Sequence, residues 1–179
     1  MGWTYGSWET REEIAKYLLG QLNNDSYQVL AHSLVGNHLW FVADRTKHIE
    51  GCVDRSIGLC LLQGWRGHGW GYKDLDEGCG PCEVDCPITY LTLAPEPTNE
   101  YSRRWREDVR QYHAVRSAKR KSIKDLKVGM TIRLRKGCTP EVVTITSLNP
   151  LRGSGYRIKP RHLPDVIEEV KDECNTTSC

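Results

Sequence analysis

The sequence has no long apolar run. No stretch of the 179-residue chain approaches the ~18 consecutive apolar residues that a membrane span needs. The residues from Met1 to Gly6 carry neither the positive charge nor the apolar core of a secretory signal. We therefore expect a soluble, cytoplasmic protein that is not exported. In that compartment its eight cysteines are expected to be reduced thiols, not disulfides.

The sequence also lacks the common signatures of nucleophilic catalysis and of nucleotide binding. It has no Gly-x-Ser-x-Gly, and no cysteine for which the sequence identifies a histidine partner. The glycines between residues 64 and 80 do not form Gly-x-Gly-x-x-Gly between a strand and a helix. A non-enzymatic protein is therefore the favoured interpretation.

Acidic residues are scarce in the second half of the chain. Residues 1–98 hold seven lysines and arginines against thirteen acidic residues, a formal charge of −6, whereas residues 99–179 hold eighteen against ten, or +8. An unequal distribution of charge indicates what kind of partner a protein binds, and says little about its fold. It predicts that the basic half meets an anionic partner.

Hydrophobic periodicity predicts an acidic α+β domain over residues 1–98, in which a helix packs on a small antiparallel sheet. Thr10 and Glu13 have the spacing of a capping box at the start of a helix. Gly36 and Asn37 separate two strand-like runs and predict a hairpin turn. The expected elements are a helix over 11–23, strands over 27–34, 38–44 and 57–62, a loop rich in glycine, tryptophan and cysteine over 64–86, and a short helix over 87–93.

The second half is predicted to be a long basic helix followed by a small β domain. Residues 99–121 read as a helix with eight positive and three negative charges. Its apolar face is expected to consist of Tyr101, Trp105, Val109 and Tyr112. Short alternating strands with glycine and Asn-Pro turns then predict a small SH3-like β-barrel or a β-meander. The predicted boundaries are a connecting helix over 99–122, the barrel over 123–170 and a frayed tail over 171–179.

The cations of this helix are the candidate contacts to an anionic partner. Together with the basic residues that follow, they would form a continuous positive surface for phosphates. Alternatively, they neutralise the acidic domain within the same chain or only favour solubility. Trp65 and Trp70 are expected to anchor either the fold or a partner. The candidate cations are Arg103, Arg104, Arg106, Arg110, Arg116, Lys119, Arg120 and Lys121.

A zinc site is the chemical alternative. Cys79, Cys82 and Cys86, with His68 upstream, supply three thiolates and an imidazole, which suit a tetrahedral zinc ion. The spacing of the third cysteine is unusual for zinc, and ordinary buried thiols explain the same residues. A zinc deaminase is a further alternative, because His48-Ile-Glu50 and Pro81-Cys82 match part of the deaminase signature, although three residues separate Cys82 from Cys86 where the signature has two.

One block of sequence resembles a known family. Residues 71–87 read Gly-Tyr-Lys-Asp-x-Asp-Glu-x-x-Gly-Pro-x-x-x-x-Cys-Pro, and Tyr-x-x-x-Trp-Arg-x-x-Val-Arg follows from Tyr101 to Arg110. With Met1-Gly2-Trp3, these motifs resemble a family encoded by phages, conjugative plasmids and other bacterial mobile elements, for which no reaction is established. The resemblance covers the N-terminal tripeptide, residues 69–91 and the helix from Asn99, and extends more weakly into the basic β domain. By analogy it implies an accessory protein of the bacterial host cytoplasm that binds nucleic acid or a host nucleoprotein and inhibits a defence system such as CRISPR.

Overall fold

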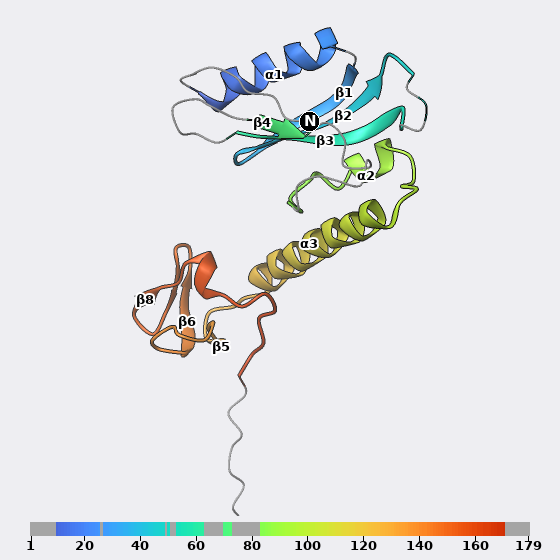
Figure 1. The fold of residues 1–179 in the computed structure, drawn as a ribbon. Coiled ribbons are helices and arrows are strands. Elements are labelled where there is room, and N and C mark those ends of the chain that lie inside the picture. The colour runs from blue at the N-terminus through green and yellow to red at the C-terminus, as the bar shows by residue number, and fades with distance from the viewer. Residues whose placement is uncertain are drawn as a thin grey trace, which may run out of the picture. The chain divides into compact units, whose positions relative to one another are not determined.

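The computed structural model divides the chain into two compact units, residues 1–113 and 114–179 (Figure 1). The division falls inside the long helix, between His113 and Ala114. No helix in the described part of the chain is long and apolar enough to cross a membrane. The structure describes residues 10–25, 27–48, 50, 53–62, 70–72 and 83–170.

The first unit is an antiparallel sheet with helices on both faces (Figure 1). Its four strands lie in the order β1-β2-β3-β4, so the predicted helix and hairpin are confirmed, and β4 is a short strand within the stretch that was predicted to be a loop. The elements are α1 (Arg11–Asp25), β1 (Tyr27–Val35), β2 (His38–Arg45), β3 (Arg55–Leu61), β4 (Trp70–Tyr72), α2 (Tyr90–Leu93) and the first half of α3 (Glu100–Lys124).

Local signals fix the start of α1 and the first turn. The backbone N–H of Glu13 donates to Thr10 Oγ1 at 3.3 Å, and the N–H of Thr10 donates to Glu13 Oε2 at 3.1 Å, which completes the predicted capping box. Gly36 has a φ of +60°, as a tight hairpin turn requires. Arg11 Nη1 donates to the Gly36 carbonyl at 2.9 Å and to Asn37 Oδ1 at 3.2 Å. The same helix turn that begins α1 therefore also holds the hairpin.

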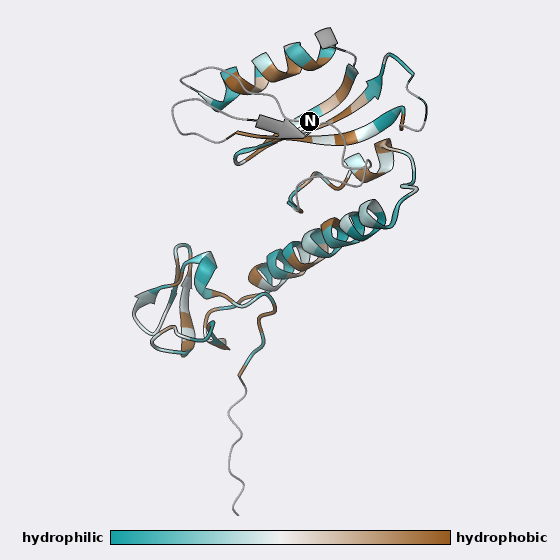
Figure 2. Cartoon of the chain, in the orientation of Figure 1, coloured by the Kyte–Doolittle hydropathy of each residue, from teal (hydrophilic) through white to brown (hydrophobic). Residues whose placement is uncertain are grey.

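The central strand β2 is buried on both faces, and its side chains alternate between two cores. Phe41 and its neighbours on that face pack against α1, while Trp40 and Val42 pack against α2 and α3. Burying each large apolar side chain contributes about 1.5–3 kcal/mol. Figure 2 shows these apolar strands beside a largely hydrophilic α3. The sheet therefore separates α1 on one side from α2 and α3 on the other.

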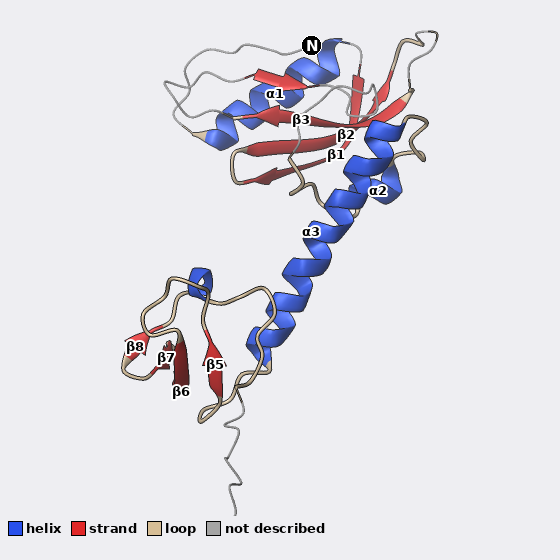
Figure 3. Ribbon diagram, turned by 60° about the horizontal axis from the view of Figure 1, so that its bottom comes forward, coloured by secondary structure: helices blue, strands red, loops and turns tan. Residues whose placement is uncertain are grey.

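The second unit is a small antiparallel sheet with the strand order β5-β6-β7-β8 (Figure 3). Its core includes Ile132, Val143, Ile145 and Ile158. Within the described residues β8 does not pair back onto β5, so an antiparallel sheet is confirmed but a closed SH3-like barrel is not. The elements are β5 (Thr131–Arg133), β6 (Val142–Leu148), β7 (Leu151–Gly153), β8 (Tyr156–Arg157) and the short 3-10 helix η2 (Pro160–His162).

Candidate nucleic-acid interface

The first half of α3 buries one of the predicted binding residues. Arg106 is only 1% exposed and, with Trp105 and Val109, lies on the helix face that packs in the core. Its guanidinium donates to the Leu91 carbonyl at 3.4 Å. The expectation that Arg106 contacts a partner is therefore corrected, because its side chain holds α3 to α2 inside the unit.

The neighbouring residues Arg103, Arg104 and Arg110 are exposed. The hydrogen bonds and ion pairs of Arg103 and Arg110 are made with residues close to them in the sequence. Arg103 donates to the carbonyls of Pro97 and Thr98 at 3.3 and 2.8 Å, just before the helix begins. Arg110 pairs with Glu107 of its own helix at 3.3 Å. Arg104 makes no ion pair or hydrogen bond with a described residue. These contacts do not use the acidic side chains of residues 1–98, so they do not support neutralisation of that region by the helix.

The second half of α3 is tied into its own unit by one carboxylate. Lys119 Nζ lies 3.4 Å and Arg135 Nη2 lies 2.7 Å from Asp165 Oδ1. Partial burial alone would raise the pKa of Asp165, but the charges and hydrogen bonds of Arg135 and Lys119 outweigh it and hold this pKa below its ordinary value. Lys119 also donates to the Leu163 carbonyl at 2.9 Å, so its ammonium group is already occupied. The remaining predicted cations of this half, Arg116, Arg120 and Lys121, are exposed.

A second group of cations, which the sequence interpretation missed, lies on β7, β8 and η2. Arg152 and Arg157 are directly opposite each other in the β7–β8 pair. Like charges in this position destabilise a sheet unless something neutralises them. With Lys159 and Arg161, they are exposed and form no ion pair with an acid in the described part of the chain. We name these four residues the β-unit cations.

A groove lies beside these cations. It is open to solvent and has a volume of about 750 Å³, and three of the four β-unit cations, Arg157, Lys159 and Arg161, line it. The other lining residues are mostly apolar and contain no carboxylate: Leu148, Asn149, Pro150, Leu151, Ile158 and Pro160. The sequence held a signal for this site, because no aspartate or glutamate occurs from Val142 to Pro164.

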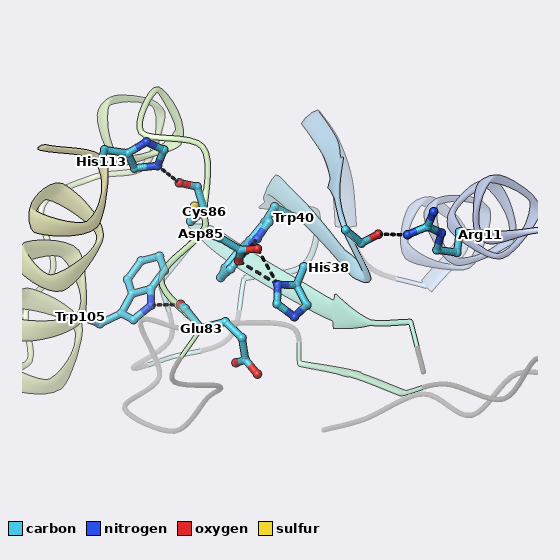
Figure 4. A network of polar contacts seen from close by, with 9 residues as sticks. Arg11, His38, Trp40, Glu83, Asp85, Cys86, Trp105 and His113 are labelled. Atoms are coloured by element: carbon cyan, nitrogen blue, oxygen red, sulfur yellow. Dashed lines mark hydrogen bonds and ion pairs between the residues drawn. The ribbon is translucent and has the colours of Figure 1, made fainter. Parts of the chain in front are cut away.

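The segment that leads into α2 is held by polar contacts from both sides (Figure 4). His38 Nδ1 lies 2.8 Å from both oxygens of Asp85, so this nitrogen must carry the proton and donate it to the carboxylate. Trp40 Nε1 donates to Asp85 Oδ1 at 3.1 Å. From the helix side, Trp105 Nε1 donates to the Glu83 carbonyl at 2.8 Å, and His113 Nε2 lies 2.7 Å from the carbonyl oxygen of Cys86. Residues 83–86 are therefore fastened to β2 and to α3 at once.

The predicted zinc ligands are only partly described. Cys86 is fully buried in the core between the sheet and α3, and its thiol lies 3.6 Å from the Pro87 carbonyl. Burial, helped by the charge of Asp85, raises the pKa of this thiol, which keeps it protonated. Cys79, Cys82 and His68 lie outside the described residues, as do Trp65 and the side chain of Trp70. Zinc binding therefore stays a prediction.

The zinc deaminase alternative has no support from the described half of its signature. His48 Nδ1 lies 3.3 Å from Asp54, with both side chains largely exposed, and Glu50 is exposed in a turn. Nowhere in the described ranges do three potential metal ligands come together. The feature best suited to a ligand is instead the groove with its β-unit cations. No protein family, no curated protein and no solved structure matches this chain.

Proposed function

We propose that this protein binds nucleic acid through its second unit, with the groove and the β-unit cations as the contact surface. The observation that carries the proposal is that Arg152 and Arg157 on the β7–β8 pair, and Lys159 and Arg161 just after it, have no acidic partner among the described residues. Phosphate groups would neutralise the opposed pair of arginines and release bound counterions. Nucleic acid is the abundant polymer that offers such groups in a regular series.

The distribution of charge over the whole chain favours the same surface. Residues 114–179 hold fourteen lysines and arginines against seven acidic residues, a formal charge of +7, whereas residues 1–113 hold eleven against sixteen, or −5. A polyanion is attracted to the second unit and repelled by the first. The unequal charges of the two units therefore favour binding at the β sheet over binding at the first half of α3.

The resemblance to proteins of phages and mobile elements supports a biological setting for this activity. In that setting the protein is a non-enzymatic accessory factor that binds the nucleic acid, or the nucleoprotein effector, of a host defence system such as CRISPR. We also propose that the second unit has an SH3-like fold and that this fold presents the binding surface.

Fluorescence anisotropy with labelled oligonucleotides at several salt concentrations tests the proposal. The double variant Arg157→Gln/Lys159→Gln is expected to lose about tenfold or more in affinity, and the salt slope should fall by roughly 2 because two phosphate contacts are removed. Arg104→Gln/Arg110→Gln is the matched control, since it removes the same charge from exposed positions of α3. It should bind like the parent protein.

Two results would contradict this assignment. An equal loss of affinity in both double variants would show that the α3 arginines also contact the nucleic acid. The absence of any salt-sensitive binding would leave a protein with an acidic surface as the partner. Thermal unfolding of each variant checks that the folded state is retained.

A further inference from the structure

We infer that the groove takes unpaired nucleotides, so that the preferred ligand is a single strand and not a duplex. The inference rests on the proposed function and specifies its ligand. It is carried by the combination of apolar and basic residues that line one groove.

The apolar lining of the groove includes surface that the fold itself does not cover. Leu148 is 48% exposed at the end of β6, and it lines the groove together with Pro150 and Pro160. A base covers such a surface only when its face is accessible, which requires that it be unstacked. In a duplex the faces are stacked inside, and only base edges and phosphates reach a protein. The apolar lining residues would therefore contribute nothing to duplex binding.

The size of the groove suits the same ligand. Its volume of about 750 Å³ falls within the roughly 300–1,000 Å³ of sites that enclose small organic ligands. A base with its sugar is a ligand of that class. A duplex, in contrast, keeps its base faces stacked inside and could only lie across the opening.

The cations that line the groove are spaced at intervals along the chain. Arg157 ends β8, and Lys159, two residues later, is also extended, with φ −92° and ψ 154°. Residues two apart in an extended chain point to the same side and are separated by roughly 6.6 Å. Arg161 continues the series on η2. Each cation can therefore contact a different phosphate of a strand whose bases contact the apolar lining residues.

The groove also predicts little sequence preference. No aromatic residue is among those lining it, and the exposed Tyr156 precedes Arg157 by one residue, so the alternation of β8 turns it to the opposite side. Leucine and proline contact any base face without reading its edge. Binding should therefore tolerate sequence and depend on the absence of a complementary strand.

The test compares the full chain with one oligonucleotide in its single-stranded form and annealed to its complement, as DNA and as RNA. The single strand is expected to bind at least about tenfold more tightly at the same salt concentration. Leu148→Ser should lower single-strand affinity about threefold or more and leave duplex affinity unchanged. Leu148→Trp should raise single-strand affinity about threefold or more, because an indole stacks on a base and a gain cannot come from misfolding.

Val166→Ser is the matched control, because Val166 is 61% exposed in the same unit but does not line the groove. It should leave both affinities unchanged. A duplex that binds as tightly as the single strand, or a single-strand preference that neither Leu148 variant alters, would overturn this inference while leaving nucleic-acid binding intact. Failure of both forms to bind would overturn the proposed function as well.

Discussion

Asp85 is the residue on which the polar contacts of the first unit converge. Its carboxylate accepts hydrogen bonds from the His38 ring and from the Trp40 indole. Both donors belong to β2, whereas Asp85 precedes α2 by only a few residues. A single side chain therefore joins the central strand to the segment that continues toward the helices.

Replacing Asp85 should destabilise the first unit. In Asp85→Asn the amide keeps one acceptor oxygen but turns an NH₂ group toward one of its two donors, so we expect a loss of about 1–3 kcal/mol in the free energy of unfolding. Urea denaturation measures this loss. Asp54→Asn is the control, because Asp54 also pairs with a histidine but its side chain is 68% exposed, and it should change stability by less than about 0.5 kcal/mol. Equal effects of the two substitutions would show that the Asp85 contacts do not stabilise the fold.

The three described cysteines should differ in reactivity. Burial raises the pKa of Cys60 to about 12 and also raises that of Cys86, whereas Cys138 is only half-buried. At pH 8 the thiolate fraction of a group with a pKa near 12 is about 10⁻⁴, far below that of a free thiol. We expect iodoacetamide to modify Cys138 at least about tenfold faster than Cys60 or Cys86, as measured by peptide mass spectrometry, and all three at similar rates in denaturant. Rapid native modification of Cys86 would contradict its burial.

At the scale of elements, α3 is held to the sheet by an aromatic pair. The rings of Trp40 and Trp105 stack with centroids 5.9 Å apart, and the Trp105 indole also donates to the Glu83 carbonyl. Both tryptophans are almost fully buried. The Trp105 side chain therefore stabilises the position of α3 both by packing and by a hydrogen bond.

Two substitutions of Trp105 should separate these contributions. Trp105→Ala leaves a cavity beside Trp40 and should cost about 3–5 kcal/mol. Trp105→Phe keeps a ring against Trp40 but loses the hydrogen bond, and should cost about 1–2 kcal/mol. Chemical denaturation monitored by circular dichroism distinguishes the two values. If the phenylalanine variant were as unstable as the alanine variant, the hydrogen bond and not the packing would be the dominant contribution.

Elements with local signals were predictable from the sequence. The capping box of Thr10 and Glu13, the glycine turn at Gly36 and the periodicity of α3 each depend on residues close together in the chain. β4 was missed because a three-residue strand in a glycine-rich stretch is defined by its pairing with β3. Barrel closure was expected from short alternating strands, but closure depends on pairing between distant strands, which alternation does not determine.

The candidate site was predictable only in part. The sequence indicated a basic second half, but the high density of arginines in α3 led to the prediction that this helix, and not the β sheet, contacts the partner. The burial of Arg106 could not be foreseen, because arginine is rarely interior and its partner here is the carbonyl of Leu91, in a different helix. Of the β-unit cations, Arg157, Lys159 and Arg161 are neighbours in the sequence, but only the register of the β7–β8 pair places Arg152 opposite Arg157.

At the scale of the whole molecule, the position of a charge should matter more than the net charge. Both double variants, Arg157→Gln/Lys159→Gln and Arg104→Gln/Arg110→Gln, change the formal charge from +2 to zero. On a heparin column at pH 7 the first should elute at lower salt than the parent protein, because the polyanion contacts the β-unit cations. The second should elute with the parent protein. Identical elution of the two variants would mean that retention follows net charge alone.

The segments that precede and follow residues 73–82 are both fastened within the first unit. On one side Tyr72 pairs with Leu59 in the sheet, and on the other side residues 83–86 are held by His38, Trp40, Trp105 and His113. All of these contacts are made by residues outside 73–82. Exchanging that interval for a peptide of equal length keeps every residue that makes them, and we expect the first unit to unfold cooperatively after the exchange and so to serve as a handle for an unrelated cargo.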